Sequence, residues 1–150
     1  MIRRSFRPSL PSMLLRWDGG SAPTNPGPSA GSYVLYESGD LDTVAEGGVF
    51  LPWATNNQAE YSGLIAGLEK ALELGVRSIR VEGDSMLAVK QVRGEWKVRS
   101  ESIRPMYERA MALVRSFHTF EAAHIPRALN ARADALSDET IKRKESWATV

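Results

Sequence analysis

Residues 32–72 of the chain read SYVLYESGDLDTVAEGGVFLPWATNNQAEYSGLIAGLEKAL, and the spacing of their apolar residues changes partway from that of strands to that of a helix. Ser32–Glu37 and Leu41–Phe50 alternate as two antiparallel strands, and Pro52 closes the second. Beyond Pro52 the apolar residues recur at helical spacing: Tyr61, Leu64, Ile65, Leu68 and Leu72. This stretch therefore predicts two strands followed by a helix.

The sequence on either side extends this order. Thr55 and Gln58 form a capping-box pair, which places the helix start at Thr55. Before the first two strands, Met13–Asp18 is typical of another strand, and residues 19–28 are rich enough in glycine and proline to predict a loop. After the helix we expect a strand, two helices, a strand and a last helix: Ser78–Gly83, a helix opening at Asp84 or Ser85, Arg104–Phe117, His118–Ile125, and Asn130 to about Lys144 with Asn130 as its cap. Three antiparallel strands followed by these elements predict a mixed α/β sheet covered by helices.

The composition is that of one domain of ordinary size. The 150 residues carry a formal net charge of +1, but basic residues gather near both ends, so net charge says little about partners. Cysteine is absent, which excludes disulfides and thiolate metal sites and favours a reducing compartment, so we expect a cytoplasmic protein. No apolar run approaches the roughly 20 residues of a membrane span, and we expect no membrane partner and no targeting segment. Residues 1–12 are expected to form a flexible basic arm, residues 13–144 the domain and residues 145–150 a C-terminal tail.

Four carboxylates stand where regular elements end or begin: Asp18, Glu60, Asp84 and Asp134. Taken singly, the three aspartates have ordinary explanations as turn, cap or first-turn residues. Glu60 lies about 40° from Leu64 around the helix, so it should lean toward the sheet. Buried together, carboxylates are costly unless cations compensate them. Oxygen ligands of this kind point to Mg²⁺ or Mn²⁺, and two such ions suit the hydrolysis of a phosphodiester.

Five short motifs occur along the chain: DGGS (18–21), NPGP (25–28), TNNQAE (55–60), GDS (83–85) and HIPRALNARAD (124–134). They stand in the order found in type 1 ribonuclease H, and the chain resembles that family from about Met13 to Lys142. The resemblance looks closest to the compact archaeal-type branch, which lacks the basic protrusion. It implies a ribonuclease H-like fold whose five-stranded mixed sheet has three antiparallel strands, then two parallel additions, flanked by helices.

The same resemblance implies an activity and its catalytic residues. The expected enzyme is an endonuclease that hydrolyses the RNA strand of an RNA–DNA hybrid with two Mg²⁺ or Mn²⁺ ions, leaving a 5′-phosphate and a 3′-hydroxyl. The four acids would be the catalytic metal ligands. His124 matches in spacing a family histidine that assists proton transfer or product release, although Ile125 and Pro126 stiffen the backbone around it. A structural histidine at a strand end is the alternative, and Arg127 is the other basic candidate nearby.

The resemblance also implies a set of substrate contacts. Gly19 and Asn25 would approach the RNA strand, and Thr55 and Asn56 the DNA strand. Asn57 and Gln58 would meet 2′-hydroxyls or bases, which suits amides that both donate and accept hydrogen bonds. The remaining members of the expected substrate-binding set are Trp96, Lys97 and Asn130. Several have structural alternatives, since Thr55 and Gln58 serve the cap and Asn25 suits a turn.

Two features of the sequence depart from a simple match. Trp96 lies among Arg93, Lys97 and Arg99, a combination typical of a nucleic-acid stacking platform, but a partly buried core tryptophan explains it equally well. Trp53 stands where many relatives have a basic residue, so the pocket for a DNA phosphate differs.

Other functions on the same fold stay open. One is a hybrid-binding or double-stranded-RNA-binding module with weak or lost catalysis, because fold alone does not determine function. Another is a related nuclease of the resolvase or integrase kind. The presence of all four acids favours an enzyme, and the TNN stretch at 55–57 favours hybrid recognition. We expect the chain to be a monomer.

Overall fold

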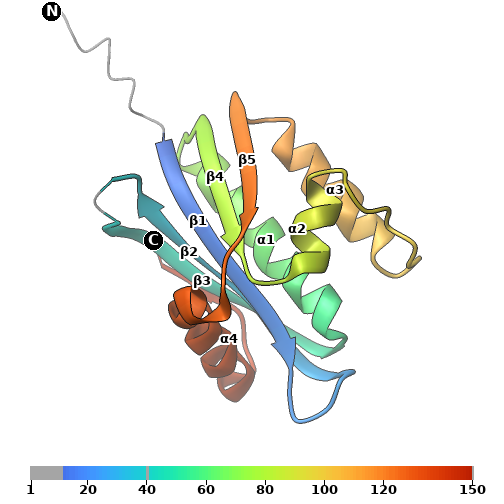
Figure 1. The fold of residues 1–150 in the computed structure, drawn as a ribbon. Coiled ribbons are helices and arrows are strands. Elements are labelled where there is room, and N and C mark those ends of the chain that lie inside the picture. The colour runs from blue at the N-terminus through green and yellow to red at the C-terminus, as the bar shows by residue number, and fades with distance from the viewer. Residues whose placement is uncertain (1–11, 40, 150) are drawn as a thin grey trace, which may run out of the picture.

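The computed structural model describes residues 12–39 and 41–149. In chain order its elements are β1 (Ser12–Ser21), β2 (Gly27–Glu37), β3 (Thr43–Ala54), α1 (Asn56–Glu73), β4 (Ser78–Gly83), α2 (Met86–Val92), α3 (Arg104–Val114), β5 (Thr119–His124), the 3-10 helix η2 (Arg127–Asn130), α4 (Ala131–Arg143) and β6 (Trp147–Ala148) (Figure 1). Within the described residues, no helix is both long and apolar enough to cross a bilayer.

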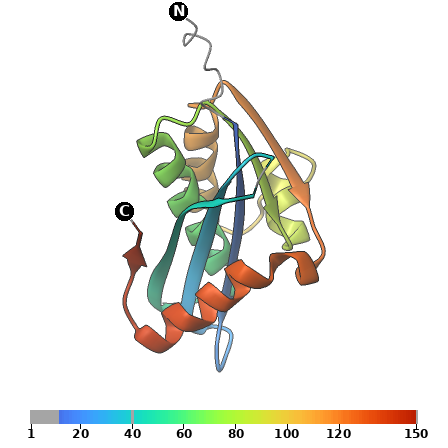
Figure 2. The ribbon, with the colours of Figure 1, turned by 90° about the vertical axis from the view of Figure 1, so that its left-hand side faces the viewer.

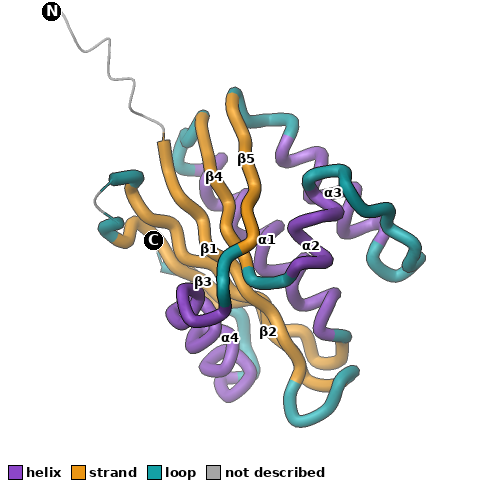
Figure 3. The backbone as a smooth tube through the Cα atoms, in the orientation of Figure 1, coloured by secondary structure: helices purple, strands orange, loops and turns teal. Residues whose placement is uncertain are grey.

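One mixed sheet organises these elements, in the strand order β5-β4-β1-β2-β3-β6 (Figure 3). β1, β2 and β3 pair antiparallel, whereas β4 adds parallel to β1, and β5 parallel to β4. The predicted α/β class and the order of antiparallel and parallel strands are therefore confirmed. The predicted number of five strands is corrected, because the described residues hold a sixth strand, β6, which pairs antiparallel with β3.

Helices cover the two faces of the sheet unequally. α1, α2 and α3 lie on one face, where the main core includes Leu15, Trp17 and Leu64. α4 crosses the other face alone (Figure 2) and buries a small cluster formed by Val34, Ala133 and Leu136. As a result, none of the described helices covers the part of this second face formed by β4 and β5, where Arg80 pairs with Glu82 and Glu121.

The glycine-rich segment after Asp18 is strand rather than loop. β1 continues through Gly19 and Gly20 to Ser21, so only residues 22–26 separate it from β2. A Cβ on Gly19 would collide with the backbone of Ala59 and Glu60 in α1. Glycine is needed here because the strand touches the helix backbone, and not because the chain turns.

Both ends of the expected domain shift. Ser12, assigned to the basic arm, is the first residue of β1, and the rest of that arm lies outside the described residues. The expected tail supplies β6, and the Trp147 indole Nε1 donates a hydrogen bond of 2.8 Å to Thr140 Oγ1 in α4. β3 also runs past Pro52 to Ala54, where a register shift in its pairing with β2 accommodates a residue without an N–H.

Candidate active site

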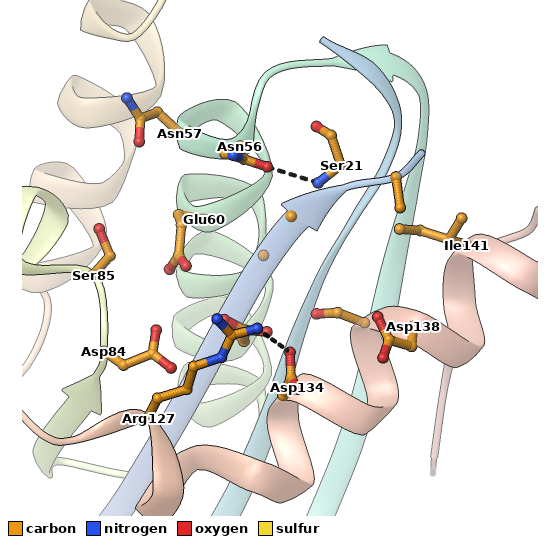
Figure 4. A pocket seen from close by; sticks show the side chains of 15 residues that line it. Ser21, Asn56, Asn57, Glu60, Asp84, Ser85, Arg127, Asp134, Asp138 and Ile141 are labelled. Carbon is orange, nitrogen blue, oxygen red and sulfur yellow. Dashed lines mark hydrogen bonds and ion pairs between the residues drawn. The ribbon is translucent and has the colours of Figure 1, made fainter. Parts of the chain in front are cut away.

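Three of the predicted acids meet at one end of the sheet. Asp18 lies near the end of β1, Asp84 follows β4 directly, and Glu60 lies in the second turn of α1. Trp17 and Gly83 are register partners in the parallel pair, so Asp18 and Asp84 leave neighbouring strands at the same level. One carboxylate oxygen from each of the three residues lies within 4.8 Å of the others. Figure 4 shows Glu60 and Asp84 turned toward the same space.

The start of α1 fixes where Glu60 lies. The Thr55 hydroxyl accepts a hydrogen bond from the Gln58 N–H at 3.1 Å, and Gln58 Oε1 accepts one from the Thr55 N–H at 2.9 Å. The predicted capping box is thus confirmed. Together with the contact between Gly19 and the helix backbone, it holds Glu60 beside Asp18. The Glu60 residue is only 7% exposed, as its place at the edge of the apolar face predicts.

Asp18 and Glu60 lie in an unfavourable environment for negative charge. Burial raises the pKa of Asp18 to about 7, and the charge of Asp84 adds to the rise. Burial likewise raises the pKa of Glu60 well above its ordinary value, with Asp18 and Asp84 adding to it. Among the described residues, Glu60 Oε1 is one of the few buried side-chain atoms without a hydrogen-bond partner. Such carboxylates suit a hard divalent cation, because their oxygens can coordinate it and its charge offsets their mutual repulsion.

Asp134 lies on α4 at the opposite wall of the same cavity, which measures about 530 Å³. It is not part of the three-residue cluster, but it faces Asp18 closely enough to raise the pKa of that carboxyl. The Arg127 guanidinium lies 3.8 Å from Asp134 Oδ1 and projects over the cavity (Figure 4). The structure therefore brings the four predicted acids to one cavity, with Asp134 at its edge.

The two basic candidates occupy different places. His124 is the last residue of β5, paired in register with Gly83, and its side chain is exposed outside the cavity lining. Arg127 lines the cavity. Of the two, Arg127 is the group positioned to meet a bound anion.

Three asparagines expected to contact substrate lie near the start of α1, and their surroundings differ. Asn57 lines the cavity and is exposed at the start of α1. Asn25 Oδ1 accepts a hydrogen bond from the Asn56 N–H at 2.9 Å, and Asn56 Oδ1 accepts one from the Ser21 N–H at 2.8 Å. Asn25 and Asn56 therefore tie the loop between β1 and β2 to the beginning of α1, and this side of the cavity has a fixed shape.

Asn130 lies in a structural position. The residue is 1% exposed, and its Nδ2 donates a hydrogen bond of 2.8 Å to the Trp17 carbonyl. It occupies the N-cap position of α4 but makes no side-chain cap hydrogen bond. Its side chain attaches the last helix to the sheet and does not line the cavity.

Trp96 and Lys97 lie away from the acids, in a separate groove after α2. Trp96 is 47% exposed, which favours the surface-platform interpretation over a core tryptophan. The groove is lined by Leu87, Gln91, Glu95, Trp96, Lys97, Arg99 and Ser100.

Some cavity residues were not singled out from the sequence. Asp138 lies one helical turn after Asp134 and lines the same cavity, along with Ser85, Ser137 and Ile141. The spacing of four residues between the two aspartates was a usable signal, because such residues share a helix face.

An antiparallel meander with parallel additions, and carboxylates gathered where β1 and β4 end, define a domain of the ribonuclease H-like class. The sequence model of the family described as "Reverse transcriptase-like" matches residues 18–140. The chain is 46% identical over 122 residues to "Ribonuclease HI" of Halobacterium salinarum, an alignment that covers 81% of this chain and 61% of that protein. The chain thus spans less than two thirds of that relative's length.

Two solved structures are similar over nearly the whole domain. The N-terminal RNase H domain of Rv2228c from Mycobacterium tuberculosis has a TM-score of 0.85 and 37% identity, covering 89% of this chain and 95% of that one. LC11-RNase H1, solved in complex with an RNA/DNA hybrid, has a TM-score of 0.81 and 30% identity, covering 87% and 97%. The chain belongs to the type 1 ribonuclease H family.

Proposed function

We propose that this protein is an endonuclease that hydrolyses the RNA strand of RNA–DNA hybrids, leaving 5′-phosphate and 3′-hydroxyl ends. The observation that carries the proposal is the convergence of Asp18, Glu60 and Asp84 within 4.8 Å, two of them with raised pKa values. A buried arrangement of this kind is costly for folding alone, so it favours a site built for cations. The hybrid-bound LC11-RNase H1 supports the choice of substrate.

The proposed cofactor is Mg²⁺ or Mn²⁺, two ions with substrate. Asp18, Glu60 and Asp84 would hold the metal, with Asp134 as a further ligand at the edge of the cavity. When bound, divalent cations activate water and stabilise the leaving oxygen in hydrolysis at phosphorus. The raised pKa values imply that protons compete with the metal for Asp18 and Glu60.

The chain's other residues have proposed parts in binding. Arg127, beside Asp134 at the cavity mouth, offers a guanidinium that pairs with a phosphate oxygen. Asn57 presents an amide that can both donate to and accept from a 2′-hydroxyl, the group that distinguishes RNA from DNA. Trp96 and Lys97 would provide stacking and charge for the nucleic acid further along the surface. We expect the protein to act as a monomer in the cytoplasm.

The test is cleavage of a labelled hybrid by the wild-type chain and by Asp18→Asn, each with Mg²⁺ and with Mn²⁺. Because the variant loses a metal ligand, its cleavage rate should fall by about a thousand-fold. Folding and most hybrid binding should persist, which circular dichroism and a gel-shift assay would check.

The same assay separates the alternatives. Full cleavage by Asp18→Asn would exclude the assigned site. Wild-type protein that binds hybrids but cuts none with either metal would be a binding module, and preferential cutting of branched or duplex DNA would indicate another nuclease on this fold.

A further inference from the structure

One arginine connects several elements of the site without lying in it. Arg16 precedes Asp18 by two residues on β1. Its Nε donates a hydrogen bond to Glu82 Oε1 at 3.0 Å, and its Nη1 donates one to the Leu129 carbonyl at 3.1 Å. Its guanidinium also lies 5.9 Å from the centre of the Tyr36 ring. A single side chain therefore contacts β2, β4 and η2 from β1.

Three of these elements, β1, β4 and η2, are followed closely in the chain by an acid of the site. Arg16 and Glu82 are register partners in the parallel pair of β1 and β4, and both strands reach their aspartate two residues later. η2 continues directly into α4, which carries Asp134. The Arg16 side chain thus contacts β4 and η2 shortly before each of these segments reaches its acid.

Two side-chain hydrogen bonds attach η2 itself to β1, between the buried residues Ile125 and Ala133 on either side. The Leu129 side chain is 56% exposed, so it does not anchor the turn by burial. Asn130 Nδ2 bonds to the Trp17 carbonyl, and Arg16 bonds to the carbonyl of Leu129. These two hydrogen bonds connect successive residues of η2 to β1. In one the donor lies on η2, and in the other it lies on β1.

Neutralising Glu82 does not require Arg16. Arg80 Nε donates to Glu82 Oε2 at 2.8 Å, and Arg80 Nη1 to Glu121 Oε1 at 3.0 Å. Burial acts to raise the pKa of Glu82, but the hydrogen bonds from Arg80 and Arg16 bring it below its ordinary value. Since one cation already serves this carboxylate, the second contact made by Arg16, to η2, is what distinguishes it.

We propose that Arg16 is a positioning residue: its guanidinium holds η2, and with it Arg127 and Asp134, in place beside the ends of β1 and β4. The inference rests on the proposed function, and it goes further in naming what aligns the separate acids. Substitution of a side chain that orients metal-binding groups without binding the metal commonly lowers activity or metal affinity about 10- to 100-fold.

The decisive variant is Arg16→Lys. Lysine keeps a cation beside Glu82, so the melting temperature should stay close to that of the wild type. A single ammonium cannot reach both acceptors in the geometry of the guanidinium fork. We expect the backbone amides of residues 129–134 to exchange with solvent about 10-fold faster, and kcat on a hybrid to fall about 10-fold with KM unchanged.

Arg80→Met is the matched control, because Arg80 shares the Glu82 contact but does not touch η2. It should leave amide exchange at residues 129–134 and kcat at the wild-type level. Arg16→Lys with unchanged exchange, or with faster exchange and unchanged kcat, would overturn the proposal, as would an Arg80→Met variant with the same losses. If the wild-type chain cut no hybrid, the proposed function would fail while the exchange data still tested the η2 contact.

Discussion

Two buried carboxylates, Glu82 on β4 and Asp18 on β1, lie two register positions apart on neighbouring parallel strands, and their surroundings are opposite. Glu82 is 9% exposed and receives hydrogen bonds from two arginines, and its pKa is lowered. Asp18 is 7% exposed and faces other carboxylates, and its pKa is raised to about 7. Burial alone therefore does not set the pKa of these two acids. Glu82 has cationic partners, whereas Asp18 has carboxylate neighbours.

The largest expected difference in stability comes from removing charge in the two places. Glu82→Gln removes the carboxylate that Arg16 and Arg80 share, although Arg80 keeps its ion pair with Glu121, so the metal-free protein should lose about 2–3 kcal/mol of unfolding free energy. Asp18→Asn removes repulsion, so the same measurement should rise. Urea titration in the presence of a chelator would compare them. If both substitutions changed the unfolding free energy in the same direction, the surroundings of Glu82 and Asp18 would not be opposite.

The next effect is on the pH dependence of the metal-free protein. Asp18 has a folded-state pKa of about 7 and a lower one when unfolded, so the native state binds the extra proton. Protonation of Asp18 therefore contributes fully to the unfolding free energy below about pH 4, and this contribution is lost as the pH rises through 7. Thermal melts with a chelator should give a Tm several degrees lower at pH 8 than at pH 5.5, and Mg²⁺ should remove most of that difference. A Tm that rises over this interval without metal would argue against the raised pKa.

The smallest effect is expected at His124, which is exposed and outside the cavity lining. A general acid or base contributes about 10²- to 10⁴-fold, so a catalytic His124 would show a loss of that size on substitution. We expect His124→Ala to leave kcat nearly unchanged and Arg127→Ala to lower it. Steady-state kinetics on a labelled hybrid would rank the two, and the reverse order would restore the catalytic histidine.

Much of the fold could be predicted from local patterns. The capping box at Thr55 and Gln58 and the helical spacing after it correctly place α1, because both signals are contained within a few residues. The order of strands and helices follows from alternation and turn residues in the same way. The convergence of Asp18 and Asp84 follows from two parallel neighbouring strands.

The errors share a different cause, since they depend on residues distant in sequence. Gly19 and Gly20 have turn-like composition, and only their pairing with Gly31 and Ala30 of β2 shows that they belong to a strand. Asn130 has the composition of a helix cap, but the Trp17 carbonyl takes its amide. Trp147 begins a strand because β3 has an open edge to pair with and Thr140 accepts its indole N–H. None of these partners is visible from the local pattern.

The contact between Gly19 and α1 also bears on the spacing of the acids. A Cβ on Gly19 would collide with the backbone of Ala59 and Glu60, so a larger residue there would push the helix away from the strand. A residue that has no side chain, and that would touch no cation, thereby limits how far apart Asp18 and Glu60 lie.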